Sequence, residues 1–327
     1  MKISFNLISC GLNNNGGSQT LILSANTLQK LGNIVTIVDS GKNQNTWNKI
    51  ECNHKIIKNL KDYPTGDIVI ATGFKTVDST LKLSKECGIK YHYIRLFEDY
   101  VCNEVQLKEI IKAPTKKIVN SLCLQRKLLT YEEPSIIIRP GYDFDKIFPL
   151  DIRKDNTDVI IGGLYSEGLK RKKKRTEWIV ECYNYLKTKY NIKLFMFGAN
   201  GTPNFKVDYY IKNPNFKEKN KLYNMVDIWL SPSCFEGLHI PPAEAMLTES
   251  VVVGNGSDQS GTEDYLIDNE TGLVSEDNFN SFLANVEILV KHKILRKELG
   301  VSGRLKILSL GTREDNMKEM IKVFKNE

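Results

Sequence analysis

The sequence has no uninterrupted apolar run that approaches the roughly 20 residues needed to span a bilayer. Its first residues, MKISFNLISCGLNNNGG, also lack the apolar h-region and the cleavage site of a secretory signal peptide. These two absences argue against a membrane-spanning or secreted protein. We therefore expect Met1 to begin the folded protein.

Cysteine and histidine are scarce and scattered. The seven cysteines form no C-x-x-C pair, and an odd number without framework spacing argues for reduced thiols and a cytosolic location. The four histidines do not cluster with the cysteines, which argues against a zinc site. We expect a cytoplasmic protein, with peripheral contact to the inner membrane face left open.

The chain carries 46 basic and 39 acidic residues, a net charge of +7. Such an excess is compatible with nucleic acid, with an anionic membrane face or with a phosphate-bearing substrate, and does not choose among them. With 41% hydrophobic and 26% charged residues, the composition is that of a globular protein. A chain of 327 residues suits two domains of about 150 residues each.

Short apolar runs such as KISFNLI, IVTIV and DIVIATG alternate with amphipathic segments such as SQTLILSANTLQKLG. This rhythm predicts α/β halves built on mostly parallel, doubly wound sheets. The charged segment Arg139–Asp158, which contains two prolines, interrupts the alternation before DVIIGGLY restarts it, so we interpret it as a linker. We predict an N-terminal domain over 1–145, a C-terminal domain over 146–308, and a final helix over 309–327 that crosses back to the N-terminal domain.

Three local features are predicted in more detail. Ser18 should cap the first helix. Pro241 and Pro242 suit the first turn of a helix, which should start near Ile240. The segment RTEWIVECYNYLKTK should be helical, and its buried candidates are Trp178, Val180, Cys182, Tyr185 and Leu186.

Two acids, Glu236 and Glu244, flank the predicted start of the helix at Ile240. The amides of Gly237, Leu238 and His239 should lie at the positive end of this helix, where a diphosphate could dock. Carboxylates would repel a diphosphate, so the two acids should bind something else. Glu244 can accept hydroxyl hydrogen bonds from a ribose, and Glu236 can reach a sugar or a developing positive charge. The alternative is that both are solvated acids at a helix end.

A second anion site is indicated by GLNNNGGSQTLIL, where Gly16 and Gly17 remove side chains just before a helix. Exposed amides and the helix dipole at such a start attract phosphates. The alternative is an ordinary flexible loop, because a lone Gly-Gly is weak evidence.

The stretches KLYNMVDIWLSPSCFEGLHIPPAEAM and VVVGNGSDQSGTEDYLIDNETGLV together resemble glycosyltransferase family 4 of the GT-B fold. RPGYDFDKIFP is similar to the family's inter-domain segment, and GGSQTLILSANTLQKLGNIVTIV is similar to its N-terminal motif. The resemblance implies a glycosyltransferase of glycan biosynthesis that moves a sugar from a nucleotide-sugar donor to an acceptor. It implies retention of anomeric configuration, and no metal or other cofactor.

The resemblance also implies roles for particular residues. Glu236 matches the family acid beside the donor sugar, and Glu244 matches the acid that binds the nucleotide ribose. Gly17, after Gly16, matches the loop glycine near the donor phosphates and the acceptor. Lys174 matches the lysine that neutralises the diphosphate, with Lys172 and Lys173 as neighbouring alternatives if the register is shifted.

The sequence departs from the family pattern at Gly163, which stands where the family has an arginine. Arg171 or Arg175 could replace that cation. Arg95 lies near the place where the family often has a histidine, and we expect it to contact the donor. His92 lies inside the strand pattern and is interpreted as a packing residue.

Other readings remain open. Asp143 and Asp145 form a D-x-D motif that could hold a divalent metal, but the family's linker pattern explains them. The run KRKKKR, Lys170–Arg175, could bind nucleic acid, although no aromatic residue is interleaved with it. A GT-B fold also suits a phosphorylase, a nucleotide-sugar epimerase or a non-catalytic nucleotide-sugar-binding protein. The sequence does not reveal the donor sugar or base, nor whether the acceptor is a sugar, a lipid-linked molecule or a protein.

Overall fold

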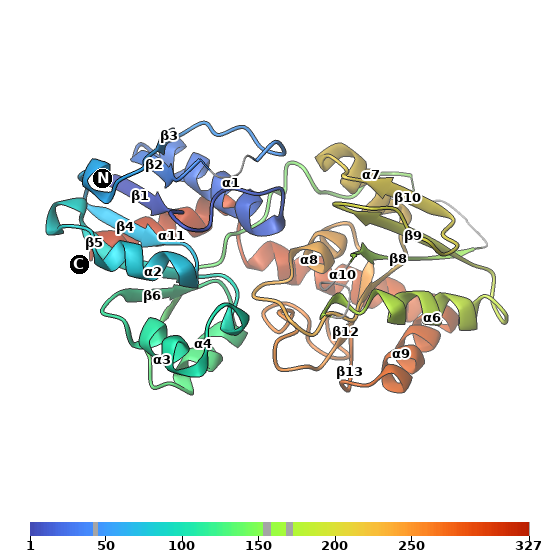
Figure 1. The fold of residues 1–327 in the computed structure, drawn as a ribbon. Helices are drawn as coiled ribbons and strands as arrows, with labels where there is room; N and C mark the ends of the chain where they lie inside the picture. Colours follow the sequence, from blue (N-terminus) through green and yellow to red (C-terminus); the bar gives the residue numbers. More distant parts are fainter. Residues whose placement is uncertain (42–44, 153–157, 168–172, 327) are drawn as a thin grey trace. The chain divides into compact units, whose positions relative to one another are not determined.

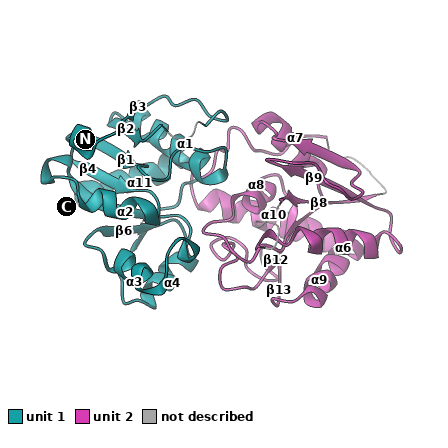
Figure 2. Cartoon of the chain, in the orientation of Figure 1, with its two compact units in different colours: residues 1–141, 313–327 teal, residues 142–312 magenta. Residues whose placement is uncertain are grey.

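The computed structural model describes residues 1–41, 45–152, 158–167 and 173–326. The chain divides into two compact units, which Figure 2 shows in different colours. Unit 1 contains Met1–Gly141 and Arg313–Glu327, and unit 2 contains Tyr142–Thr312. The structure thus places the boundary after Gly141, where the sequence placed it after residue 145, and the C-terminal segment that joins unit 1 begins at Arg313.

Unit 1 is built on a parallel sheet of seven strands in the order β3-β2-β1-β4-β5-β6-β7. The central strands are short apolar runs because helices cover both faces of the sheet, which leaves few positions for polar residues. The strands are β1 (Lys2–Asn6), β2 (Ile34–Asp39), β3 (Asn53–Ile56), β4 (Ile68–Ala71), β5 (Ile89–Ile94), β6 (Lys116–Val119) and β7 (Ile136–Ile137).

The helices of unit 1 pack on the two faces of this sheet (Figure 1). On one face, α1 and α11 share a core with alternate residues of the strands, such as Phe5, Ile70 and Tyr91. On the other face, α2, α3 and α4 enclose a second core that includes Ile94 and Val119. The helices are α1 (Gly16–Lys30), α2 (Phe74–Leu81), α3 (Glu104–Lys112), α4 (Leu122–Leu129) and α11 (Arg313–Lys325), with single 3-10 turns at Leu60–Asp62, Lys85–Cys87 and Asp99–Val101.

Unit 2 repeats this plan with a parallel sheet of six strands in the order β10-β9-β8-β11-β12-β13. Helices α6 and α9 pack on one face, and α7, α8 and part of α10 pack on the other. The strands are β8 (Val159–Tyr165), β9 (Ile192–Gly198), β10 (Tyr209–Lys212), β11 (Ile228–Ser231), β12 (Val251–Asn255) and β13 (Leu273–Ser275). The helices are α6 (Thr176–Leu186), α7 (Phe216–Met225), α8 (Ile240–Leu247), α9 (Phe279–Lys291) and α10 (Lys293–Ser309).

Both sheets follow the doubly wound order, in which the chain moves outward in one direction and then returns to the middle to build the other half. The predicted fold class is therefore confirmed. The direction reverses between β1 and β4 in unit 1, and between β8 and β11 in unit 2. Loops that leave the carboxyl ends of strands at such a point diverge and leave room for a ligand.

Two local predictions are confirmed and one is wrong. Helix α8 begins at Ile240 with its two prolines in the first turn. His92 is fully buried in β5 and packs edge-on against Phe74. Ser18, however, is not the cap of α1. Asn15 caps the helix by accepting a hydrogen bond from the Ser18 amide at 2.9 Å, so the helix starts at Gly16.

The buried face of α6 was predicted only in part. Cys182 and Leu186 are buried, but Tyr185 is 44% exposed and Trp178 and Val180 are half-buried. Ile179 and Tyr183 are buried instead. The buried residues recur at intervals of three and four, which is the helical spacing, whereas the predicted set included positions two apart.

The segment interpreted as a linker is packed rather than solvated over its described residues. Tyr142 and Ile147 are buried in a core of unit 2. The side-chain oxygens of Asn220 and Asn224, on α7, accept hydrogen bonds from the amides of Phe148 and Leu150 at 3.0 and 2.6 Å. These contacts anchor the start of unit 2 on α7.

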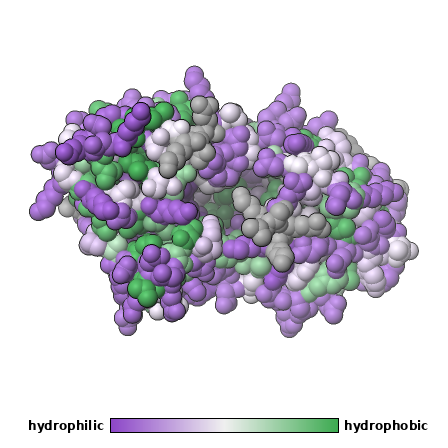
Figure 3. Space-filling view, viewed as in Figure 1, coloured by the Kyte–Doolittle hydropathy of each residue, from purple (hydrophilic) through white to green (hydrophobic). Residues whose placement is uncertain are grey.

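Hydrophilic side chains cover much of the face seen in Figure 3. No helix in the described parts of the chain is long and apolar enough to cross a membrane.

Candidate active site

Glu236 lies in the loop between β11 and α8, beside the point where the sheet of unit 2 reverses direction. Its Oε1 accepts a hydrogen bond from Ser233 Oγ at 2.6 Å and forms an ion pair with Lys174 Nζ. Lys174 comes from the segment between β8 and α6. The reversal point therefore brings together a carboxylate and an ammonium group that are 62 residues apart in the sequence.

The ion pair is partly shielded from water, since the Lys174 side chain is 24% exposed and that of Glu236 is 13% exposed. Burial alone would raise the pKa of Glu236 and is the largest single influence on it. Lys174, His239 and the Ser233 hydroxyl together outweigh that effect, so the pKa of Glu236 is lowered from its ordinary value. Glu236 is consequently an anion at neutral pH and cannot supply a proton.

His239, at the N-cap position of α8, is the third polar side chain of this group. Its Nδ1 lies 3.0 Å from Ser231 Oγ, and its Nε2 lies 3.6 Å from Glu236 Oε1 and has no hydrogen-bond partner among the described residues. Burial lowers the pKa of His239 to about 4. The imidazole is therefore neutral at pH 7. Together with Lys174 and Ser233, it lines a small cavity.

The backbone before α8 is held by the loop that follows β12. The amide of Glu236 donates to the carbonyl of Gln259 at 2.7 Å, and that of His239 donates to the carbonyl of Gly261 at 2.9 Å. One of the three amides expected to bind a diphosphate, that of His239, therefore already has a partner inside the chain, while Gly237 and Leu238 are buried beside it.

Glu244 lies one turn inside α8 and is 8% exposed. Lys219 Nζ lies 2.9 Å from its Oε1 and 3.0 Å from its Oε2, and Tyr223 donates from its hydroxyl to Oε2 at 2.8 Å. Both partners come from one face of α7, because they are four residues apart. Glu244 is thus not a solvated acid at a helix end.

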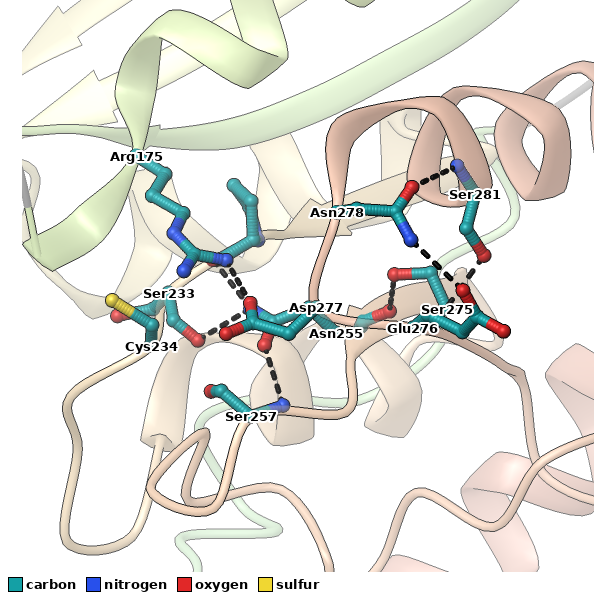
Figure 4. A network of polar contacts seen from close by, with 12 residues as sticks. Arg175, Ser233, Cys234, Asn255, Ser257, Ser275, Glu276, Asp277, Asn278 and Ser281 are labelled. Atoms are coloured by element: carbon teal, nitrogen blue, oxygen red, sulfur yellow. Dashed lines mark hydrogen bonds and ion pairs between the residues drawn. The ribbon is translucent and has the colours of Figure 1, made fainter.

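Arg175 contacts other residues than those around Glu236. Its guanidinium pairs with Asp277, in the loop between β13 and α9, and stacks 4.3 Å above the ring of Trp178. Figure 4 shows the side chain directed at Asp277, with Ser233 and Cys234 nearby. Burial is the largest single influence and would lower the pKa of Arg175, but the hydrogen bonds and charge interactions with Asp277 and Cys234 together outweigh it and raise the pKa. The structure therefore does not bring Arg175 to the Lys174–Glu236 pair, and Arg171 lies outside the described residues.

Gly163, at the position that the resemblance assigns to the family arginine, is packed under α6. A Cβ built on it would lie 2.6 Å from Ile179 Cδ1, so even alanine would require Ile179 to move. The glycine therefore fits the packing of β8 against α6.

The other predicted site residues, Gly16, Gly17 and Arg95, lie in unit 1, near the point between β1 and β4 where its sheet reverses direction. Arg95, directly after β5, donates to the carbonyl of Gly17 and, at 3.0 Å, to that of Thr72 after β4. Gly16 and Gly17 form the first turn of α1, and nothing lies within 4 Å of a Cβ built on Gly16. Burial lowers the pKa of Arg95, and its Nε has no partner among the described residues.

Asp143 and Asp145 lie in a turn, where the Asp143 carbonyl accepts from the amides of Lys146 and Ile147. The described part of the chain contains no group of three or more His, Cys, Asp or Glu side chains arranged to hold a metal ion.

A profile of the family described as "Glycosyl transferases group 1" matches residues 159–292, the range that contains Lys174, Glu236 and Glu244. Comparison with curated proteins gives no match.

Solved structures share the architecture of both units. Sucrose-phosphate synthase from Thermosynechococcus elongatus is 13% identical, with 99% of this chain and 98% of that chain covered and a TM-score of 0.80. HepE from Anabaena, solved in complex with UDP-glucose, is 10% identical, with both chains covered fully and a TM-score of 0.80. WaaG, a glycosyltransferase involved in lipopolysaccharide biosynthesis, is 12% identical over the full length of both chains, with a TM-score of 0.73.

The fold is thus that of the GT-B glycosyltransferases. The profile match shows that residues 159–292, which lie in unit 2, are similar to the glycosyl transferases group 1 family.

The sequence did not single out several residues that hold the candidate site in place. Lys219 and Tyr223 are four residues apart on α7, so helical spacing places them on one face, but it does not reveal the contact of that face with Glu244. Ser233 and Gly261 gave no signal of their own, because their roles depend on loops that meet only in the fold.

Proposed function

We propose that the protein is a glycosyltransferase, which moves a sugar from a nucleoside-diphosphate sugar to an acceptor with retention of anomeric configuration and without a divalent metal. The observation that carries the proposal is the ion pair between Lys174 and Glu236, held by Ser233 at the reversal point of unit 2. A fixed cation and a fixed anion at one edge suit a donor whose diphosphate is negative and whose sugar becomes positive in the transition state.

Lys174 would stabilise the leaving group. Cleavage of the bond between the anomeric carbon and the phosphate oxygen adds negative charge to the departing nucleoside diphosphate. An ammonium group has three N–H donors, so Lys174 can keep its contact with Glu236 and still donate to a phosphate oxygen. A cation already fixed in a partly buried site does not have to reorganise when the charge develops.

Glu236 would act on the sugar. Because its pKa is lowered, it serves as an anion that accepts hydroxyl hydrogen bonds or faces the positive charge at the anomeric carbon. Its Oε1 accepts from Lys174 and Ser233, and these contacts withdraw charge from the carboxylate and lower its nucleophilicity. We therefore favour attack by the acceptor hydroxyl on the face that the diphosphate leaves, and this course retains the configuration.

Glu244 would bind the ribose, in a more limited way than the sequence predicts. A carboxylate has about four accepting positions, and Lys219 and Tyr223 occupy three of those of Glu244. The remaining position, on Oε1, permits one direct bond to a ribose hydroxyl instead of two. Since HepE was solved with UDP-glucose, UDP-sugars are the first donors to test.

The acceptor would bind on unit 1, near Gly16 and Gly17, while Arg95 is kept as the donor contact predicted from the sequence. The Arg95 guanidinium is fixed by two carbonyl groups, and its Nε keeps a donor for a substrate.

A thermal-shift screen of UDP, GDP and ADP, with their sugars, tests the proposal first, because a ligand that binds the folded state raises its melting temperature. The stabilising donor is then incubated with candidate acceptors in EDTA, and released nucleoside diphosphate is measured. We expect turnover that survives the chelator and a product whose anomeric coupling constant in NMR matches that of the donor. Binding without turnover would indicate a nucleotide-sugar-binding protein, and loss of turnover in EDTA would indicate a metal.

A further inference from the structure

A pocket of about 740 Å³ opens on unit 1 at the amino ends of β4, β5 and β6. Substrates of doubly wound sheets bind at the carboxyl ends of the strands, so this pocket lies at the edge opposite to the one that holds Arg95 and Gly17. We call it the amino-edge pocket. It is lined by Asp67, Lys85, Gly88, Ile89, Lys90, Lys112, Ala113, Pro114, Thr115, Lys116, Lys117 and Glu133.

The pocket is strongly basic, with five lysines against two carboxylates. Both carboxylates are already engaged: Asp67 accepts from the amide of Lys2 at 2.7 Å, and Glu133 lies 3.4 Å from the ammonium groups of Lys112 and Lys117. The acids therefore leave an excess positive charge of about three in one concave site.

Two of the lysines are fixed by backbone carbonyls. Lys90 donates to the carbonyls of Leu81 and Leu83, both at 2.8 Å. Lys117 donates to the carbonyl of Ala113, and its side chain is only 4% exposed. Each ammonium group has three N–H donors, and these contacts leave Lys90 with one more. Lysines ordered in this way lose little side-chain entropy when they bind an anion.

Thr115 supplies a second, independent indication of a ligand. It is 9% exposed and lines the pocket, and its hydroxyl has no hydrogen-bond partner among the described residues. A buried hydroxyl without a partner costs free energy that a bound acceptor would recover. A phosphate group would satisfy the hydroxyl and the lysines together, because it offers several acceptor oxygens and a negative charge.

We propose that the amino-edge pocket is a binding site for a phosphate group, separate from the donor site. Either a soluble phosphorylated molecule or the headgroup of an anionic lipid presents this chemistry. All of its lining residues belong to unit 1, whereas Lys174 and Glu236 belong to unit 2, so the pocket can be tested independently of the proposed transfer reaction.

The first test measures the melting temperature against inorganic phosphate at constant ionic strength, in a Lys174→Met background that weakens the proposed diphosphate site. We expect a saturable rise. The double variant Lys112→Gln/Lys116→Gln should raise the phosphate Kd about tenfold, because hydrogen bonds to charged groups contribute about 1.5–3 kcal/mol. Lys58→Gln/Lys61→Gln is the matched control: both lysines are exposed, and they lie beyond β3 at the other side of the sheet.

Thr115→Val separates binding from folding. Valine has nearly the same shape, so removal of an unpartnered hydroxyl should leave the melting temperature without phosphate unchanged or higher. The phosphate Kd should nevertheless rise about fivefold, as expected for the loss of one hydrogen bond.

The second test measures flotation with vesicles of phosphatidylglycerol and phosphatidylcholine, and with phosphatidylcholine alone. Vesicle binding lost in Lys112→Gln/Lys116→Gln but kept in Lys58→Gln/Lys61→Gln would assign the site to a lipid headgroup, even if inorganic phosphate gave no shift. A saturable phosphate response without vesicle binding would assign it to a soluble ligand. The proposal is overturned if neither phosphate nor vesicle binding depends on the pocket lysines more than on the control lysines.

Discussion

The proposed roles of Lys174 and Glu236 predict different effects of their substitution on the binding of the nucleoside diphosphate. If Lys174 holds the diphosphate and Glu236 faces the sugar, Lys174→Met should weaken binding of the free nucleoside diphosphate, whereas Glu236→Gln should not. Glutamine keeps an oxygen that can accept from Ser233, and it releases the ammonium group from its ion pair. Glu236→Gln should therefore leave diphosphate affinity unchanged or improve it.

The expected magnitudes follow from how far the pair is buried. Loss of a charged hydrogen bond of about 1.5–3 kcal/mol corresponds to a roughly tenfold or greater rise in the Kd of the diphosphate in Lys174→Met. In turnover, both variants should lose about 10²–10³ in kcat, the usual effect of removing one transition-state electrostatic contact. With side chains 24% and 13% exposed, the pair lies between surface and buried ion pairs, so either change should cost about 1–3 kcal/mol in stability.

The assay is calorimetric titration with the nucleoside diphosphate that the screen identifies, followed by kcat with its sugar. Lys173→Met is the matched control, since Lys173 is adjacent in sequence but lies 3.5 Å above the ring of Phe235. Equal loss of diphosphate affinity in Lys174→Met and Glu236→Gln would refute the division of roles. A larger loss in Lys173→Met than in Lys174→Met would show that the register of the lysine is shifted by one.

Three further predictions concern single residues. Glu244→Gln should weaken binding of the nucleoside diphosphate by about 1–3 kcal/mol in calorimetry, through the ribose bond, and unchanged affinity would exclude that role. Gly261→Ala should lower stability and kcat more than Gly32→Ala does: both glycines have positive φ, +69° and +84°, but only at Gly261 would a Cβ meet Glu236 Cβ, at 2.6 Å. Burial lowers the pKa of His92 to about 3, so as pH falls below about 6.5 the unfolded state binds a proton that the folded state does not. Denaturant unfolding should therefore show about 2 kcal/mol of stability lost between pH 7 and pH 5 that His92→Leu restores and His292→Leu, at an exposed position, does not.

The fold was predictable because strand runs and helix starts are local signals. The apolar runs and the proline pair before Ala243 mark elements whose neighbours in sequence suffice to define them. The prediction that Ser18 caps α1 was wrong, because local sequence does not decide between two good capping residues. Asn15 and Ser18 are both suitable, and the choice depends on which side chain reaches which amide in the folded chain.

The candidate site was predictable only where a motif carried it. Glu236 and Glu244 were found as acids around a helix start, but their partners were not, because Ser233, Lys219 and Tyr223 act through contacts that tertiary packing creates. The same reason explains Arg175. The basic run shows only that Arg175 is a cation. Its pairing with Asp277 depends on how the loop between β13 and α9 folds.

Charge balance in unit 2 follows from these contacts. A diphosphate brings more negative charge than one lysine can neutralise, and the position of the family arginine is occupied by a glycine packed against Ile179. Of the other cations considered for the diphosphate, Arg175 is bound to Asp277, and Lys173 lies over the ring of Phe235. Under the proposed function, the amides around Gly237 and Leu238 and the dipole of α8 therefore have to carry more of the charge than in a relative that keeps the arginine. Partial charges of this kind are weaker than a guanidinium, so the donor should bind with lower affinity here, and its binding should depend more on how firmly the loop at Gly261 holds the start of α8.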